Sequence, residues 1–318
     1  MITRMGLGLA ALGRPGYINI GHADDLERDY DVDAMRRRAH AVLDAAYGAG
    51  VRYFDTARSY GRAEEFLGGW LQARDPAGVT CASKWGYTYT AGWRVEADHH
   101  EIKDHSLAAL ERQWPESRAH LAGHLDLYQI HSAVPETGVL ENTDVLRRLA
   151  ELKREGTRIG LSLSGPAQGD TLRKAMEVRV DGVALFDAVQ ASFNLLEVAA
   201  ADALREAHAA GLRVIVKEGM ANGRLGPRGD RAEDAEARGI LNEQVARLKT
   251  TPDAFALAFV LSRPWVDIVL SGASAIDHLE SNLRAVDVIW DGEAEAAATR
   301  VAQDSRAYWA VRSKLPWG

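Results

Sequence analysis

The chain has 318 residues, of which 47% are hydrophobic and 26% charged, which is ordinary for a globular protein. Its 38 Lys and Arg against 45 Asp and Glu give a net charge of −7, which argues against a nucleic-acid-binding protein because such proteins usually carry a basic face. The single cysteine, Cys81, allows no internal disulfide, and no apolar stretch approaches a membrane span or the core of a signal peptide, so we expect a cytoplasmic protein with no membrane partner.

Short apolar runs alternate with helical patterns along the whole chain. Strands are predicted at 5–12, 51–56, 79–85, 125–131, 158–164, 188–193, 213–218 and 267–272. The clearest helices are predicted at 33–50, 64–74, 102–114, 143–156, 200–211, 240–248, 252–262 and 276–286. Strand followed by helix, repeated, implies a parallel sheet, and near-continuous hydrophobicity within strands is typical of strands covered on both faces.

Eight such units predict an α/β fold, a (β/α)8 TIM barrel formed by one domain over residues 1–318. An open doubly wound sheet is the competing architecture, but the glycines of "GLGLAALG" after the first strand are not spaced as G-x-G-x-x-G. Two long connections, 13–32 and 86–101, contain aromatic residues and are expected to be active-site loops. The tail "RAYWAVRSKLPWG" is expected to pack on the barrel.

Polar residues stand at three consecutive strand ends, where a (β/α)8 barrel carries its active site. Asp55 ends the second strand in "FDTARSYG", with Tyr60 in the loop beyond it. Lys84 ends the third strand and His131 the fourth. Each alone fits a structural role, as an ion pair, a loop aromatic or a core histidine, but all four at one mouth favour catalysis.

The chemistry of these four residues follows from burial and charge. An ion pair between Asp55 and Lys84 would remove the cost of burying either one alone. The Lys84 ammonium is expected to lower the pKa of Tyr60 from its ordinary value of about 10, so that the phenol exchanges a proton nearer neutral pH. His131 is expected to orient a carbonyl group or to share the proton.

The stretches "FDTARSYG", "CASKWG" and "LDLYQIHS" resemble the catalytic motifs of the aldo-keto reductases, in order and in context. The resemblance implies a nicotinamide dinucleotide bound extended across the barrel mouth, and hydride transfer to the carbonyl carbon of an aldehyde, ketone or sugar. It implies that Tyr60 is the proton donor, or the base in the reverse reaction. The alternatives are a cofactor-binding regulatory subunit with little turnover, and a metal-dependent lyase or hydrolase, for which the chain shows no metal motif.

Cofactor contacts are also implied by the resemblance. They are Ser162, Gln190, Lys217, Gly223, Leu225, Gly272, Ser274, His278 and Asn282. Leu163 stands where relatives usually have Asn, and Lys217 stands at or next to the aromatic residue that stacks on the nicotinamide. Relatives that prefer NADP often carry Lys or Arg near the start of the last motif, where this chain has Gly272, Ala275 and His278. NADP(H) is therefore expected as the family default, with NAD(H) as the alternative.

An aromatic wall is expected to bind the small-molecule carbonyl or alcohol substrate. Trp85, directly after Lys84, is the first candidate, with Tyr17 and Trp93 from the two long loops. The loop 13–32 is expected to determine specificity. No pattern in the chain predicts its oligomeric state.

Overall fold

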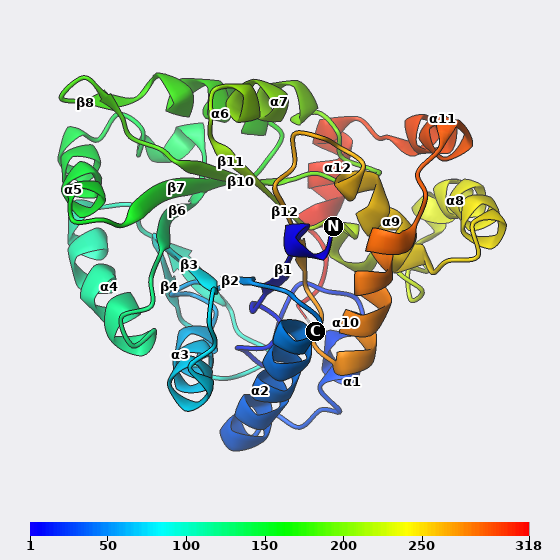
Figure 1. Cartoon of the computed structure of the whole chain (residues 1–318), viewed down its shortest axis with the longest axis horizontal. Helices are drawn as coiled ribbons and strands as arrows, with labels where there is room; N and C mark the ends of the chain where they lie inside the picture. Colours follow the sequence, from blue (N-terminus) through cyan, green and yellow to red (C-terminus); the bar gives the residue numbers. More distant parts are fainter. Residues whose placement is uncertain (318) are drawn as a thin grey trace.

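Eight parallel strands close into a barrel in the computed structural model, which describes residues 1–317 (Figure 1). The strands are β1 (Met5–Gly8), β2 (Tyr53–Asp55), β3 (Thr80–Trp85), β6 (Leu127–Ala133), β7 (Arg158–Leu163), β10 (Ala188–Ser192), β11 (Arg213–Lys217) and β12 (Ile268–Ser271). Their order around the barrel is β1-β12-β11-β10-β7-β6-β3-β2. Because β1 pairs with both β2 and β12, the barrel is closed, and the TIM-barrel prediction is confirmed over the open sheet.

Helices surround the strands on the outside of the barrel (Figure 1). They are α1 (His22–Asp25), α2 (Val32–Gly48), α3 (Ala63–Arg74), α4 (Leu107–His120), α5 (Thr143–Arg154), α6 (Gln168–Glu177), α7 (Ala201–Ala209), α8 (Ala235–Arg247), α9 (Pro252–Leu261), α10 (Ile276–Leu283), α11 (Gly292–Val301) and α12 (Ser305–Arg312). Single 3₁₀ turns occur at Ile2–Arg4, Pro135–Thr137, Ala221–Gly223, Ala232–Asp234 and Arg284–Asp287. Two short antiparallel hairpins, β4 (Tyr87–Tyr89) with β5 (Glu101–Lys103) and β8 (Arg179–Val180) with β9 (Val183–Ala184), stand apart from the barrel.

The start of the helix predicted at 102–114 was wrong. Residues Glu101–Lys103 form β5, which pairs with β4 in the hairpin. The Ser106 hydroxyl then accepts a hydrogen bond from the Ala109 amide at 3.2 Å, which caps α4 and sets its first residue at Leu107. The periodic pattern marked the helix, but the capping residue fixed where it begins.

Strand alternation explains why polar side chains gather at one end of the barrel interior. The interior is filled by an apolar cluster of Tyr53, Ala82, Leu127, Ala188, Ile215, Ile268 and Leu270. Residues two positions further along a strand share its face. The next inward positions on β2, β3, β6, β10 and β11 are Asp55, Lys84, Gln129, Gln190 and Lys217. The polar residues therefore form the layer directly above the apolar core.

The C-terminal segment packs on the barrel, as expected. Tyr308 and Trp309 of α12 are buried, and the Asn194 amide donates a hydrogen bond to the Tyr308 hydroxyl at 3.1 Å. Arg312, at the end of α12, donates to the Glu218 carboxylate at 2.7 and 3.2 Å. Since Glu218 follows β11 directly, this contact brings the tail to the edge of the mouth.

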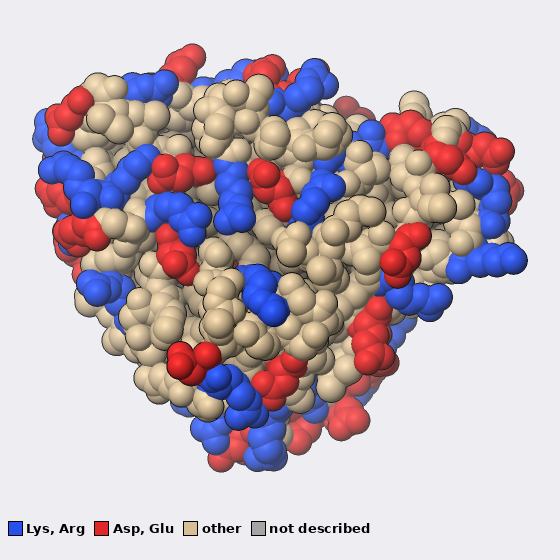
Figure 2. All heavy atoms as spheres, viewed as in Figure 1, with Lys and Arg blue, Asp and Glu red and all other residues tan. Residues whose placement is uncertain are grey.

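Charges are mixed over the face of the molecule that Figure 2 shows. Acidic and basic side chains are interspersed there, and no continuous basic stripe crosses this face. Across residues 1–317, no helix combines the length and the apolar character needed to cross a lipid bilayer.

Candidate active site

The opening of the barrel holds a buried ion pair between neighbouring strands. Asp55 ends β2 and Lys84 lies near the end of β3, and the Lys84 ammonium donates to the Asp55 carboxylate. The same ammonium donates to the Thr56 carbonyl at 3.0 Å. Both side chains are almost completely buried, so each supplies the partner that the other needs.

Two amides hold the other oxygen of Asp55. The Gln190 side chain from β10 donates to Oδ1 at 2.9 Å, and Gln129 from β6 donates to it at 3.3 Å. Gln190 and Gln129 are 135 and 74 residues away from Asp55 in the sequence. The carboxylate is therefore fixed from three strands and cannot turn without breaking several hydrogen bonds.

Tyr60 and His131 lie beside this pair. The Tyr60 hydroxyl is 3.4 Å from His131 Nε2, and the Lys84 ammonium is 4.8 Å from the centre of the Tyr60 ring. His131 Nδ1 lies 3.5 Å from the Ser59 hydroxyl. The structure thus brings together all four residues that the sequence singles out.

The pKa of Tyr60 differs from the sequence expectation. Burial raises it well above its ordinary value of 10.0, and the Asp55 carboxylate adds to the rise, while Arg14 opposes it. The expected lowering by Lys84 was wrong for this structure. The Lys84 ammonium is already neutralised by Asp55 and directs hydrogen bonds at the carboxylate and a backbone carbonyl, so the Tyr60 phenol remains protonated.

His131 is held as a neutral imidazole. Burial is the main cause that lowers its pKa well below 6.5, and the positive charges of Lys84, Lys217 and Arg14 lower it further. The register of β6 shifts between Ile130 and Ala133, around His131, and Ser132 has a left-handed backbone (φ 52°). Such a bulge redirects the chain at the end of a strand, here between the histidine and the loop that follows.

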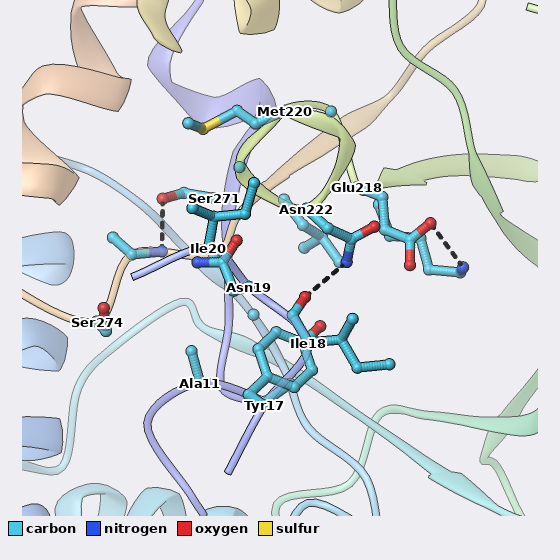
Figure 3. A pocket seen from close by; sticks show the side chains of 18 of the residues that line it. Ala11, Tyr17, Ile18, Asn19, Ile20, Glu218, Met220, Asn222, Ser271 and Ser274 are labelled. Atoms are coloured by element: carbon cyan, nitrogen blue, oxygen red, sulfur yellow. Dashed lines mark hydrogen bonds and ion pairs between the residues drawn. The ribbon is translucent and has the colours of Figure 1, made fainter. Parts of the chain in front are cut away.

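One cavity of about 350 Å³ extends over these residues. It is bordered by Asp55, Tyr60, His131, Gln190 and Lys217 at one end and by Gly272, Ser274, His278 and Asn282 at the other. Figure 3 shows residues 17–20 next to Asn222 at the wall of the cavity, where the Asn222 amide donates to the Ile18 carbonyl at 2.9 Å and so links the two loops. The cavity is thus a channel between two loops, with the ion pair at one end.

Comparison with known proteins decides the family. The sequence model described as the aldo/keto reductase family matches residues 4–298. The chain belongs to the aldo/keto reductase family.

Relatives and solved structures agree with this assignment. Aldo-keto reductase str7 of Strobilurus tenacellus is 27% identical, over 94% of this chain and 88% of its own. Pyridoxal 4-dehydrogenase of Microbacterium luteolum is 24% identical, over 91% and 89%. The holo structure of aldo-keto reductase AKR11C1 from Bacillus halodurans has the same fold, with a TM-score of 0.71, 22% identity and coverage of 95% and 92%.

The expected cofactor residues do not all reach the cavity. Gln190, Lys217, Gly223, Gly272, Ser274, His278 and Asn282 line it. Ser162 is buried and its hydroxyl accepts a hydrogen bond from the Ser132 amide at 2.8 Å, so it positions the backbone after His131 instead. Leu225 packs in the hydrophobic core. Ser164, which directly follows β7 and continues its inward face, lines the cavity. Leu163 points the other way and is buried in the core outside the barrel interior.

A carboxylate that the sequence analysis missed stands at the end of the cavity next to α10. The Asp25 side chain is 3% exposed, and one of its oxygens accepts a hydrogen bond from Ser274 at 2.9 Å and lies 3.6 Å from His278 Nδ1. Its other oxygen pairs with Arg228 of the loop after β11. Ser274 and His278, expected to contact the cofactor, thus lie against a negative charge.

Two of the three expected substrate residues lie elsewhere. Tyr17 lines the cavity, as expected, but neither Trp85 nor Trp93 is among the described residues that do so. Trp85 is completely buried next to His105, because the residue after an inward lysine points outward into the helix layer. The Trp93 indole donates to the Tyr30 carbonyl at 2.7 Å and joins the two long loops to each other.

Several charged residues of the cavity wall were not predicted. Arg14 is buried, pairs with Glu101 at 3.0 Å and lies 5.1 Å from the Tyr60 ring centre and 4.8 Å from that of Trp317. Glu218 and Arg312 form the ion pair described above. The only sign in the sequence that these residues line the site was their position. Arg14 and Glu101 belong to the two long loops, 13–32 and 86–101, and Glu218 directly follows β11.

Proposed function

We propose that the protein is an NAD(P)(H)-dependent reductase of aldehydes or ketones, or the corresponding alcohol dehydrogenase. The observation that supports this most is the arrangement of Tyr60, His131 and the Lys84–Asp55 pair beside a cavity that is also lined by Gly272 and Asn282, from the segment that follows β12. The family assignment supports an oxidoreductase, and the geometry adds a proton donor, a hydrogen-bond partner and a fixed electrostatic pair.

The proton is supplied by Tyr60 in this proposal. Its raised pKa keeps the phenol protonated, which is the form that can donate to a carbonyl oxygen as negative charge develops there. His131, neutral and 3.4 Å from the hydroxyl, is placed to hold the same oxygen by a hydrogen bond. The Lys84–Asp55 pair lies beside Tyr60, with the ammonium 4.8 Å from the centre of its ring, and keeps the charges around the phenol in a fixed arrangement.

The residues of the cavity fit a nicotinamide dinucleotide, which supplies the hydride when it is bound. Gly223 has a φ of 90° where the loop after β11 approaches Ile20, so a backbone without a side chain borders the cavity there. No side chain caps the start of α10, so its first amide groups are available to an anionic group. We infer that these positions hold the phosphates, and that Asn282, 4% exposed beside Ser271, contacts the adenosine.

The choice between NADP(H) and NAD(H) depends on Asp25. A 2′-phosphate at Ser274 and His278 would meet the Asp25 carboxylate, whereas a ribose hydroxyl could donate to it. Arg228 also lines the cavity and is a cation, but it is already paired with Asp25. The geometry around Asp25 therefore favours NAD(H), whereas the resemblance to the family predicted NADP(H).

The decisive experiment is turnover. NADH and NADPH oxidation is followed at 340 nm with a panel of aldehydes, ketones and sugars, in the wild type and in Tyr60→Phe. We expect turnover in the wild type and a kcat lower by about 10²- to 10⁴-fold in the variant, with cofactor affinity from fluorescence titration unchanged.

Tyr128→Phe is the control, because Tyr128 is a fully buried tyrosine on β6 that faces the helix layer and is not among the described cavity-lining residues. It should keep the wild-type kcat. Tight cofactor binding with no turnover on the whole panel would contradict the proposal and favour a cofactor-binding regulatory subunit.

A further inference from the structure

Lys217 is a cation at the catalytic end of the cavity that the proposed mechanism does not use. It ends β11 on the inward face, lines the cavity, and its side chain is 18% exposed. Its ammonium donates to the Ser192 hydroxyl at 2.8 Å, the one hydrogen bond that it makes to the described residues. An ammonium has three N–H donors, so donors remain for a ligand.

The neighbouring carboxylate is largely committed to other groups. Arg312 donates twice to one oxygen of Glu218, and the Ser192 hydroxyl donates to the other oxygen at 2.6 Å. Lys217 lies 3.9 Å from that second oxygen, beyond hydrogen-bond distance. Figure 3 shows the Glu218 carboxylate at this wall of the cavity. Glu218 is thus shared between two cations, and Arg312 holds it more closely.

The charges at this end of the cavity do not balance. Lys84 is paired with Asp55 and Arg14 with Glu101, which leaves Arg312 and Lys217 to share Glu218. Among residues 1–317, four cationic side chains at this end of the cavity therefore face three carboxylates. A buried charge without its own partner is costly, and a ligand with one negative charge would remove that cost.

The position of Lys217 points to the substrate rather than to a cofactor phosphate. Lys217 contributes to the electrostatics of His131, and both line the same end of the cavity as Tyr60. The positions proposed for the phosphates, at Gly223 and the start of α10, lie in the loop after β11 and after β12. An anion at Lys217 would therefore lie close to the groups that handle the carbonyl.

Resting on the proposed function, we propose that Lys217 binds a carboxylate of the substrate, so that the preferred substrates are aldehydes or ketones that also carry one carboxylate. The Lys217 ammonium would hold the carboxylate while Tyr60 and His131 hold the carbonyl oxygen. This makes Lys217 a specificity-determining residue rather than a proton donor.

The proposal implies a dependence on pH. Burial lowers the pKa of Lys217 to about 8, Arg312 and Lys84 lower it further, and Glu218 and Asp55 oppose the shift. The ammonium is present below that pH and is lost as the pH rises through it. Preference for the acidic substrate should fall over the same range.

The test compares matched substrates in three proteins. 4-Carboxybenzaldehyde is paired with its methyl ester, and succinic semialdehyde with butanal, in the wild type, Lys217→Met and Lys217→Arg. We expect kcat/KM for the acids to exceed that for the neutral partners by about 10- to 100-fold in the wild type and this ratio to collapse in Lys217→Met. The ratio is the readout, because Lys217 lines the cavity proposed to hold the cofactor and its loss can change kcat/KM for every substrate alike. Lys217→Arg should retain much of the ratio, and raising the pH from 7 to 9.5 should reduce it only in the wild type.

Lys103→Met is the control, since Lys103 lies on β5 with its ammonium on the Ser132 carbonyl and is not among the described residues lining the cavity. It should keep the wild-type ratio. An equal loss for acidic and neutral substrates in Lys217→Met, or no preference in the wild type, would overturn the proposal. The proposal would also be overturned if the only change in Lys217→Met were in the binding of the oxidised or reduced cofactor.

A binding measurement separates this proposal from the proposed function. Benzoate, which cannot accept a hydride here, is titrated against wild type and Lys217→Met by calorimetry, with benzamide as the neutral probe. Benzoate bound by the wild type and not by the variant supports the Lys217 site even if no aldehyde is turned over. Equal benzoate binding by both proteins overturns it even if turnover is found.

Discussion

The two ends of the cavity are built in different ways. At the catalytic end, Asp55, Lys84, Gln129 and Gln190 come from four barrel strands, and the last three donate hydrogen bonds to the Asp55 carboxylate. At the other end, Asp25 comes from the loop 13–32 and Arg228 from the loop after β11. The first set is buried above the core, whereas Arg228 is 43% exposed.

This difference suggests a division of tasks. Groups held by strands are fixed by the barrel's own hydrogen bonds, which suits chemistry that needs a constant geometry. Groups held by loops can exchange partners at low cost, because a partly exposed ion pair contributes little to stability. We therefore expect substitutions at the strand end to affect stability and turnover together, and substitutions at the loop end to affect ligand preference.

The largest expected effect is that of Lys84→Met. Removing the ammonium leaves the Asp55 carboxylate buried and unpaired, which should lower the free energy of unfolding by about 3–5 kcal/mol and abolish turnover. Urea unfolding followed by tryptophan fluorescence measures the first effect.

The double variant Lys84→Met with Asp55→Asn is the control for that experiment. It removes both charges, so it should recover a large part of the lost stability while remaining inactive. If the single variant were as stable as the wild type, this would contradict the view that the groups held by the strands are the rigid end of the cavity.

A smaller effect is expected for Gln190→Met. The 2.9 Å hydrogen bond to the Asp55 carboxylate is charge-assisted, so its loss should cost about 1.5–3 kcal/mol. Gln129→Met is the matched control, because its hydrogen bond to the same oxygen is longer, at 3.3 Å, and should contribute less. Equal losses would show that Asp55 is not held chiefly from β10.

Strand positions were the part that the sequence could predict. Period-2 alternation and apolar runs located all eight barrel strands, and the same alternation brings Asp55, Lys84 and Gln190 to one face. It could also have shown that Trp85 points outward, because it follows an inward lysine. Applying the alternation one residue further would have prevented that error.

The loop contacts and the pKa of Tyr60 could not be predicted in the same way. Asp25 meets Ser274 across 249 residues, and no local pattern determines which loop residues meet. The direction of the Tyr60 pKa depends on the balance between burial and several charges, including Arg14, Glu101 and Glu218, whose positions become known only in the folded chain. Pairwise reasoning from Lys84 alone gave the wrong sign.

The smallest free-energy change is expected for Asp25→Ser at the loop end. Serine removes the charge that would repel a 2′-phosphate and frees Arg228 to pair with it, so NADPH affinity should rise about tenfold relative to NADH, about 1.4 kcal/mol. Dissociation constants for both cofactors, from fluorescence titration at two salt concentrations, measure this shift, which should shrink at high salt.

Asp24→Ser, one residue earlier, is the matched control, because the Asp24 carboxylate is exposed and not among the described cavity-lining residues. An unchanged cofactor ratio in Asp25→Ser would mean that the cofactor does not extend to this carboxylate, and that the loop end does not set cofactor preference.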